Sequence, residues 1–287
     1  MTVSRSRWAV KKAARKAFMI GSSCARTLRR RGEPAGSTVR VLTYHRFGES
    51  VRDPWCVRPD DFEQQLRWLA ERGLAVSLSD VLLFVAGEKS LKDGSILLTM
   101  DDGFGSVATH AAPLMRRYGV PGVAYVTTSL VGLDQRDQGQ PDRYLTWDEI
   151  ASLPSAGIEV GSHAHTHRSL GKMPLEEAVH EGARSKELLD AHLDRPVTSF
   201  AYPFGMRPDE TSDTARVLTE LGYTSIFIAQ HGTLQRGADA ARLPRVKVEG
   251  GERAWTFPLL CEGAMDAWKV VDDTLWYLQR PEADRSR

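Results

Sequence analysis

Two adjacent carboxylates, Asp101 and Asp102, directly follow the largely apolar run 96–100 and precede Gly103. A short apolar run bounded by polar residues is typical of a buried strand, and α/β barrels carry their functional residues at the C-terminal ends of strands. Because adjacent carboxylates repel each other, they favour a positive charge nearby. A divalent metal ion would supply that charge, with one aspartate as ligand and the other as general base. The alternative is a capped loop, since aspartate is also common in turns.

Three histidines, His163, His165 and His167, follow a second short apolar run further along the chain. His163 and His167 are four residues apart, which predicts that both imidazoles lie on one side of a helical turn. Imidazole and carboxylate ligands together suit zinc and neighbouring divalent metals. Structural histidines are the alternative, but two strand ends with metal-ligand residues favour a metal site.

Three segments resemble the motifs of one enzyme family, the polysaccharide deacetylases, which are NodB-like carbohydrate esterases of family 4. Residues 99–103, T-M-D-D-G, resemble the family's T-F-D-D-G motif. Residues 161–167, G-S-H-A-H-T-H, resemble its H-[ST]-x-x-H segment, and residues 200–205 have the form F-A-Y-P-F-G of its third motif. The resemblance extends from about residue 39 to residue 248, with the motifs in the family's order.

The resemblance implies a role for each motif residue. Asp102, His163 and His167 would hold a divalent metal, zinc in the first instance, with nickel or cobalt as alternatives. Asp101 would take a proton from water, and the metal together with the backbone N–H of Phe204 would stabilise the tetrahedral oxyanion. His165 is not expected to bind the metal; its side chain should either point elsewhere or contact a residue that does bind it.

Two departures from the family pattern concern side chains near these motifs. Met100 replaces a phenylalanine, and Tyr202, a candidate substrate contact, stands where many members carry an arginine that contacts the catalytic aspartate. Arg245 lies in an L-P-R-V segment that resembles the family's L-P-R-[IV], whose arginine can sit near that aspartate. We therefore expect Arg245 to compensate for Tyr202, with an ordinary surface arginine as the alternative.

A further histidine, His45, ends the alternating segment 39–45 directly after Tyr44. In the biofilm-type branch of the family, an N-terminal strand ending in Y-H supplies an active-site histidine. The resemblance thus implies that His45, in its protonated form, donates a proton to the departing amine. A structural histidine is the alternative, and His231, in a polar loop after a strand expected at 223–228, is a lesser candidate for the acid.

The elements that must position these residues alternate between strands and helices, which favours parallel strands with helices outside. The resemblance narrows this fold class to an irregular (β/α) barrel of about seven parallel strands. Asp60 and Asp61 are expected to cap one helix, Ser79 a second, and Thr146 a third that begins at Trp147. Trp147 is a candidate wall of a sugar subsite, with a buried tryptophan at a helix start as the alternative. Further strands are expected at 199–201 and 242–248, and a helical stripe at 263–278.

The composition is that of a soluble globular protein, with 287 residues, 41% hydrophobic and 26% charged. The net charge of +1 gives no strong field for nucleic acid, and no nucleic-acid-binding motif is visible. The three widely spaced cysteines, Cys24, Cys56 and Cys261, form no disulfide framework and fit a reducing compartment.

The N-terminal segment is unusually basic, because many lysines and arginines precede its first acidic residue, Glu33. Its apolar run 17–20 is too short for the core of a signal peptide or a membrane span. We therefore expect a cytoplasmic protein, with residues 1–34 either disordered or lying on an anionic membrane surface. The expected organisation is a basic tail or amphipathic segment at 1–37, a catalytic domain at 38–250 and a helical extension at 251–287.

The activity implied by the resemblance is hydrolysis of an N-acetyl group on an amino sugar, with release of acetate. The substrate could be a polysaccharide, an oligosaccharide or a lipid-linked precursor. An esterase acting on sugar O-acetyl groups is one alternative, and an inactive carbohydrate-binding or assembly protein is another. The complete aspartate and histidine set argues against the inactive alternative.

Overall fold

A parallel sheet of seven strands forms the centre of the molecule, in the order β8-β7-β6-β5-β4-β1-β9. The computed structural model describes residues 5–29, 37–49, 53–134, 142–252 and 254–275. The strands of this sheet are β1 (Val39–Tyr44), β4 (Ser95–Met100), β5 (Gly122–Val126), β6 (Ile158–Ser162), β7 (Ser199–Ala201), β8 (Ser225–Phe227) and β9 (Val246–Lys247). Two short strands, β2 (Arg46–Phe47) and β3 (Cys56–Val57), pair separately. The expected α/β barrel of about seven parallel strands is confirmed.

The two edges of the sheet are joined by the segment 243–247. Leu243 forms a parallel bridge with Phe227 of β8, and Val246 pairs with Leu42 of β1. The strand expected at 242–248 is therefore shorter, because its first residues pair with one sheet edge and its last residues with the other. Arg245 lies at this join, between the two edges.

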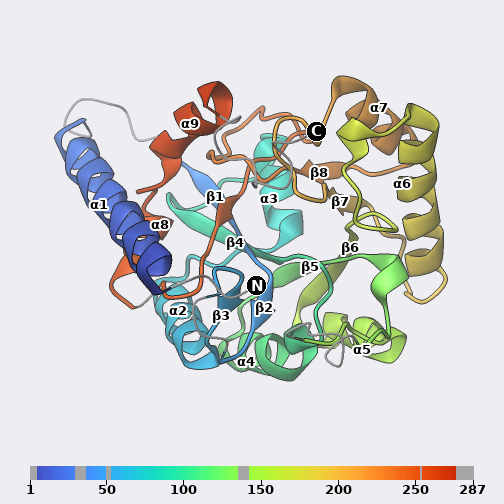
Figure 1. The fold of residues 1–287 in the computed structure, drawn as a ribbon, viewed down its shortest axis with the longest axis horizontal. Helices are drawn as coiled ribbons and strands as arrows, with labels where there is room; N and C mark the ends of the chain where they lie inside the picture. The colour runs from blue at the N-terminus through green and yellow to red at the C-terminus, as the bar shows by residue number, and fades with distance from the viewer. Residues whose placement is uncertain (1–4, 30–36, 50–52, 135–141, 253, 276–287) are drawn as a thin grey trace.

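Helices surround the sheet, as Figure 1 shows. They are α1 (Arg5–Arg29), α2 (Pro59–Arg72), α3 (Leu78–Val85), α4 (Ala112–Tyr118), α5 (Trp147–Ser152), α6 (Leu175–Asp190), α7 (Ser212–Glu220), α8 (Thr256–Cys261) and α9 (Lys269–Thr274). The stripe expected at 263–278 is interrupted, since a 3₁₀ turn, Asp266–Trp268, precedes α9, and residues 276–278 lie outside the described residues.

The helix starts follow local capping chemistry, with two differences from expectation. Thr146 and Glu149 form the expected capping box of α5. α3 is capped by Ser77 rather than Ser79, because the reciprocal partner, Asp80, lies three residues after Ser77. Asp60 and Asp61 do not cap α2, which begins at Pro59; they occupy its first turn, where negative charge is favourable.

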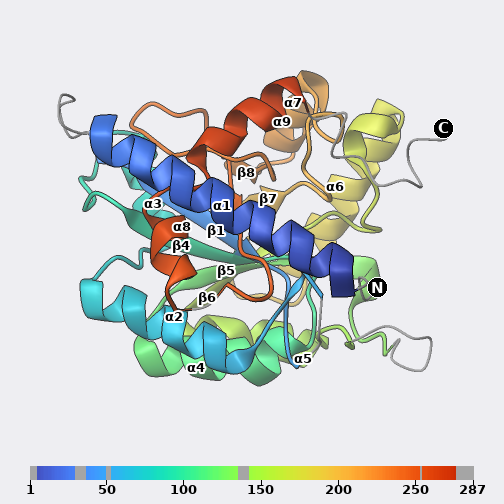
Figure 2. The same ribbon diagram turned by 60° about the vertical axis from the view of Figure 1, so that its left-hand side comes forward.

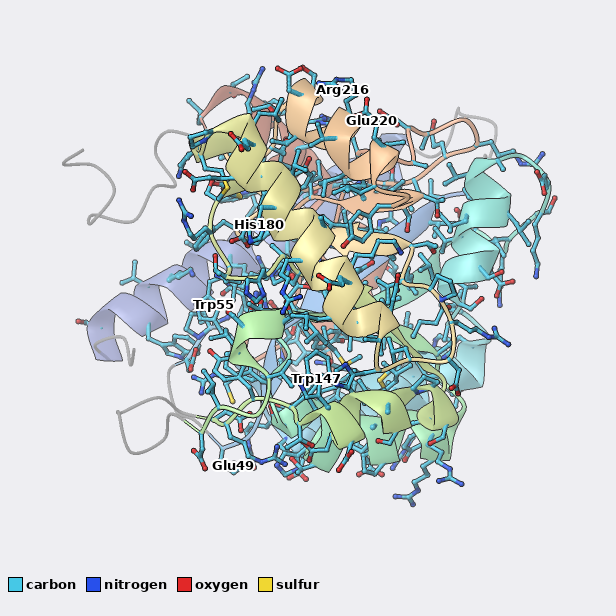
Figure 3. The ribbon with its side chains drawn as sticks, turned by 90° about the vertical axis from the view of Figure 1, so that its right-hand side faces the viewer. Glu49, Trp55, Trp147, His180, Arg216 and Glu220 are labelled. Atoms are coloured by element: carbon cyan, nitrogen blue, oxygen red, sulfur yellow. The ribbon has the colours of Figure 1, made fainter. Side chains whose placement is uncertain are left out.

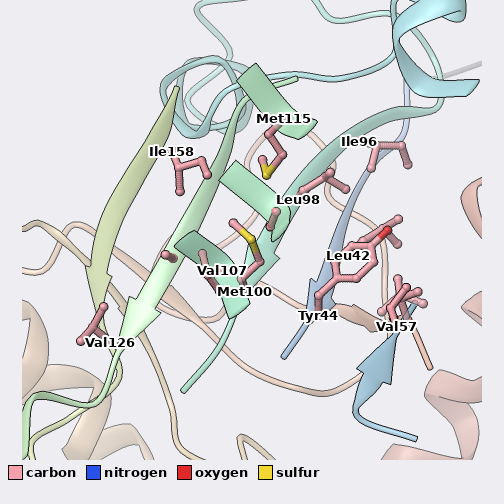
Figure 4. Packing of buried hydrophobic residues seen from close by; sticks show 14 of the residues in the cluster. Leu42, Tyr44, Val57, Ile96, Leu98, Met100, Val107, Met115, Val126 and Ile158 are labelled. Carbon is pink, nitrogen blue, oxygen red and sulfur yellow. The ribbon is translucent and has the colours of Figure 1, made fainter. Parts of the chain in front are cut away.

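The core fills the space between the sheet and its helices. β1 and β4 are buried along their whole length, which fits parallel strands covered on both faces. Figure 4 shows part of this packing, including Leu42, Leu98, Met100 and Met115. Met100 is 1% exposed, so the residue that departs from the family motif serves the core behind the aspartates.

α1 is a long helix that packs on the barrel beside α8, and Figure 2 shows it crossing the molecule in front of β1. Met19 of α1 is 1% exposed and belongs to the main hydrophobic core. Lys12 donates to Glu249 at 2.8 Å and Arg15 to Glu252 at 2.8 Å. Within the described residues, no helix is both long enough and apolar enough to cross a membrane.

Candidate active site

Three side chains with metal-ligand chemistry meet at the C-terminal ends of β4 and β6. Asp102 follows β4, and His163 follows β6 directly. The Asp102 Oδ1 atom lies 3.4 Å from His163 Nε2 and 3.1 Å from His167 Nε2. One ligand atom from each residue lies within 4.8 Å of the others. The ends of β4 and β6 lie at the same edge of the sheet, because both strands pair in parallel with β5, which lies between them.

The two histidines do not share a helical turn, which corrects the expectation from their spacing. Residues 163–169 form a loop, and His167 has a left-handed φ of 57°. The ring of His167 turns back toward Asp102, and its centroid lies 5.1 Å from that of His163. A loop with a backbone reversal therefore brings these imidazoles together.

The protonation pattern of His163 fits a metal ligand. Its Nδ1 atom lies 2.7 Å from the carbonyl oxygen of Ala201. Because a carbonyl only accepts, Nδ1 carries a hydrogen, and Nε2, which lies 3.4 Å from Asp102 Oδ1, is the ring atom that could bind a cation. Metal-ligating histidines are commonly oriented by such a bond from the other ring nitrogen. The donor set of one carboxylate and two imidazoles therefore fits a divalent cation.

The loop of the histidines is fixed by a residue that sequence reasoning missed, Glu181 of α6. Its buried carboxylate accepts hydrogen bonds from His165 N at 2.9 Å, Thr166 N at 2.7 Å and Thr166 Oγ1 at 2.5 Å. The His165 Nδ1 atom instead lies 2.9 Å from Thr128 Oγ1. His165 is thus absent from the ligand cluster. No local signal distinguishes Glu181 from the other glutamates of its helix.

Asp101 is bound by Arg245 rather than by the metal-ligand cluster. The buried guanidinium donates to both carboxylate oxygens, at 2.6 and 2.8 Å, and Arg245 is 1% exposed. It also donates to Thr43 and Thr99. Burial alone would raise the pKa of Asp101, but the charge of Arg245, aided by nearby histidines, lowers it overall. The surface-arginine alternative for Arg245 is therefore wrong.

Backbone strain is concentrated in these segments. Among the described residues, the non-glycine positions with left-handed φ are Asp102 at 73°, Ala164 at 61°, His167 at 57° and Phe204 at 61°. Such conformations are uncommon for residues with a Cβ and cluster at functional sites. All four belong to the three motif segments, which supports a functional demand on their geometry.

The third motif contributes Phe204 to the site but not the side chain of Tyr202. The Phe204 ring is 57% exposed and lies 4.9 Å from the His167 ring. No described residue accepts a hydrogen bond from its backbone N–H. Tyr202 is 1% exposed, its hydroxyl bonds Thr214 at 3.0 Å, and burial raises its pKa to about 12. The expected substrate contact by the Tyr202 side chain is therefore wrong, because this side chain is part of the core.

His45 lies just beyond β1, with its ring 4.3 Å from that of Trp55. Its Nδ1 atom is buried and has no hydrogen-bond partner among the described residues. Burial lowers the pKa of His45 to about 4, although the charges of Asp102 and Asp101 oppose this shift. The imidazole is thus neutral near pH 7, which differs from the expected protonated form.

Two other candidates are engaged elsewhere. Trp147 begins α5 and stacks on His192 at 4.0 Å, which supports the structural alternative. His231 donates its backbone N–H to Asp272 at 2.6 Å, and its Nδ1 lies 2.8 Å from the same carboxylate. These contacts tie the loop after β8 to α9, so His231 has a structural partner that His45 lacks.

Comparison with known proteins agrees with this geometry. Residues 88–226 match the family profile described as Polysaccharide deacetylase. The protein YxkH of Bacillus subtilis (strain 168) is 25% identical over 214 residues, 74% of this chain and 71% of its own. A poly-beta-1,6-N-acetyl-D-glucosamine N-deacetylase of Staphylococcus aureus (strain MRSA252) is 20% identical over 203 residues, 68% of each chain.

Similarity to a solved structure covers most of the chain. The structure of IcaB from Ammonifex degensii is 27% identical in sequence, with a TM-score of 0.68. The match covers 80% of this chain and 97% of that one. The motif geometry, the family profile and these relatives agree, and residues 88–226 therefore form a polysaccharide deacetylase domain.

Proposed function

We propose that the protein is a metal-dependent hydrolase that removes N-acetyl groups from amino sugars and releases acetate. The observation that carries this proposal is the placement of two adjacent aspartates in different settings. Asp102 faces two imidazoles, and Asp101 faces a buried guanidinium. The carboxylate of Asp102 is thereby available to bind a metal, and that of Asp101 is available to accept a proton.

Asp102, His163 and His167 would hold the metal, with zinc, nickel and cobalt all compatible with the donor set. When bound, such an ion acts as a Lewis acid and makes water more acidic. Asp101 then serves as general base, and Arg245 keeps it ionised and oriented. The N–H of Phe204, held by the left-handed turn, is the candidate donor to the oxyanion.

His45 would protonate the leaving amine. Because His45 is neutral near pH 7, it must gain a proton during the reaction before donating it. Asp101 takes one proton from water, and transfer of that proton toward His45 would balance the step. The C–N bond breaks as the amine receives the proton, which leaves acetate and a free amino sugar.

The substrate class rests on the relatives rather than on a bound sugar. The S. aureus relative is named for poly-beta-1,6-N-acetyl-D-glucosamine. We therefore propose N-acetylglucosamine units of a poly- or oligosaccharide, or of a lipid-linked precursor. A sugar O-acetyl esterase remains the alternative activity, since the same groups can attack an ester.

Acetate release, measured by mass spectrometry over a substrate panel, tests this proposal. The panel contains N-acetylglucosamine oligomers, lipid-linked glycans and O-acetylated sugars, and Asp101→Asn is the control variant. We expect release from at least one N-acetylated substrate, and a large loss in the variant. Release from O-acetyl sugars alone would support the esterase, and no release from any substrate would contradict the proposed activity.

A peripheral membrane association through residues 1–34, with a cytoplasmic location, is proposed separately. Support comes from the basic N-terminal composition and from the exposed Val10 and Ile20 on α1. Lys12 and Arg15 face the barrel, so their charges are already engaged. Co-sedimentation with anionic and neutral vesicles is the measurement, and equal recovery with both would contradict the association.

A further inference from the structure

An exposed tryptophan stands at the side of the site where His45 lies. Trp55, in the loop between β2 and β3, is 45% exposed, and its ring lies 4.3 Å from the His45 ring at an angle of 60°. Figure 3 labels it on the face shown there. An exposed aromatic ring beside a candidate reacting group offers an apolar surface to a ligand of that site.

Residues 53–56, which include Trp55, are tied to their neighbours by several contacts. Asp53 is 3% exposed, forms an ion pair with Arg46, and accepts a hydrogen bond from Trp55 N at 2.8 Å. Arg46 N donates to Trp55 O at 3.2 Å. Gly250 packs so closely beneath the loop that a Cβ there would collide with the carbonyl oxygens of Asp53 and Cys56. The indole is therefore held in place by its backbone.

A half-buried lysine, Lys247, lies against one face of the indole. The Lys247 Nζ atom lies 2.8 Å from the centroid of the Trp55 ring. Burial lowers the pKa of Lys247 well below its usual value, and the neighbouring Glu249 only partly opposes this. The face of an indole attracts a lysine amine, so this contact ties the Trp55 side chain to β9.

We propose that Trp55, held by Lys247, is the surface on which the sugar of the leaving amine rests. This inference rests on the proposed function. If His45 protonates the leaving nitrogen, the sugar ring must extend from that nitrogen past His45, where the indole is exposed. The apolar C–H face of a sugar packs on an aromatic ring, and the face of the indole opposite Lys247 is the one left for it. Trp55 would thus determine affinity for the glycan.

The experiment compares Trp55→Ala and Trp55→Phe with Trp255→Ala. Trp255 is a matched control, because it is 52% exposed and also has a lysine, Lys16, over its ring, but it lies at the start of α8. We expect Trp55→Ala to raise KM for an N-acetylglucosamine oligomer about tenfold, with a smaller change in kcat. Trp55→Phe should recover part of the loss, and Trp255→Ala should match the wild type.

The outcomes separate this inference from the proposed function. Wild-type protein that releases no acetate from the oligomer contradicts the proposed function itself. Active wild-type protein with the same KM in Trp55→Ala and Trp255→Ala overturns the role of Trp55 alone. Melting temperatures and metal content of each variant show whether the fold and metal site are kept. A fall in kcat without a rise in KM would also overturn the binding role.

Discussion

At the scale of single residues, the role of each aspartate in the site depends on the side chains that its carboxylate contacts. Asp101 and Asp102 are neighbours in sequence, yet one carboxylate faces Arg245 and the other faces two imidazoles. The left-handed φ of Asp102 separates them, since it turns the chain sharply after Asp101. Substitutions can therefore distinguish their roles.

Metal content should depend on His163 and His167 but not on His165. We expect the double variant His163→Ala/His167→Ala to lose bound metal, because only Asp102 of the donor set would remain. His165→Ala is the matched control from the same loop, and it should retain metal because its Nδ1 faces Thr128. Elemental analysis of purified protein is the measurement, and undiminished metal in the double variant would refute this ligand set.

Arg245 should be needed for both stability and activity. Arg245→Met leaves a buried carboxylate without its cation, which typically costs about 3–5 kcal/mol of unfolding free energy. Arg242→Met is the control, because Arg242 is a partly exposed neighbour paired with Glu210, where the loss should be about 1 kcal/mol or less. Denaturant unfolding measures both. Equal stabilities of the two variants would contradict the role of Arg245.

His45 should contribute to catalysis more than His231. Removing a general acid typically lowers kcat by about 10² to 10⁴, so we expect His45→Ala to do so on an amide substrate while metal stays bound. The loss should be smaller on an activated ester, whose leaving group needs little protonation. His231→Ala, at the loop tied to Asp272, should do much less. Full amide activity in His45→Ala would exclude it as the acid.

At the scale of elements, α1 is part of the barrel's structure. Its cations face Glu249 and Glu252, and Arg15 also donates to the carbonyl oxygen of Lys247 at 2.8 Å. α1 thereby supports β9, which follows Arg245 and carries Lys247. Some cations of this basic helix therefore pair with carboxylates of the same chain, which the sequence alone did not predict.

Two adjacent positions of α1 test this docking. Met19→Ala should destabilise the protein by about 2–5 kcal/mol, because it leaves a cavity in the core. Ile20→Ala is the control at the next residue, where the side chain is 48% exposed and the expected loss is within about 0.5 kcal/mol. Thermal and denaturant unfolding measure both. A Met19→Ala variant as stable as Ile20→Ala would show that α1 does not dock in solution.

At the scale of the whole molecule, the hydrophobic core and the candidate metal site lie in different places. The hydrophobic core lies between the sheet and its helices, whereas the ligand cluster lies at the strand ends. Two of the three ligand residues, Asp102 and His167, are only partly buried. We therefore expect the core to keep its packing whether or not a metal is bound.

Removal of metal by a chelator should abolish activity and leave the fold intact. Loss of a ligand present at about a thousand times its Kd costs about 4 kcal/mol of stability, so we expect a lower melting temperature. The far-UV circular dichroism spectrum should stay unchanged at 25 °C, and added zinc, nickel or cobalt should restore activity. Loss of secondary structure on chelation would contradict this separation.

The sequence by itself determined the strand–helix alternation, the ends of β4 and β6 and the aspartate and histidine set. These features are local: strand ends, capping boxes and apolar runs depend on residues within a few positions of each other. The prediction from spacing was wrong at His167. Its left-handed φ excludes the helical turn that the four-residue spacing from His163 suggested.

Tertiary structure decided which distant groups meet, and of the two pairs below only Arg245 with Asp101 was expected, from the resemblance of the L-P-R-V segment. Arg245 and Asp101 are 144 residues apart, and they pair because the segment 243–247 joins the two edges of the sheet. Trp55 and Lys247 meet for the same reason, since β9 lies beside β1 and its loop. The partners of buried charges depend on strand order and on the free energy of burial, which no local pattern of residues records.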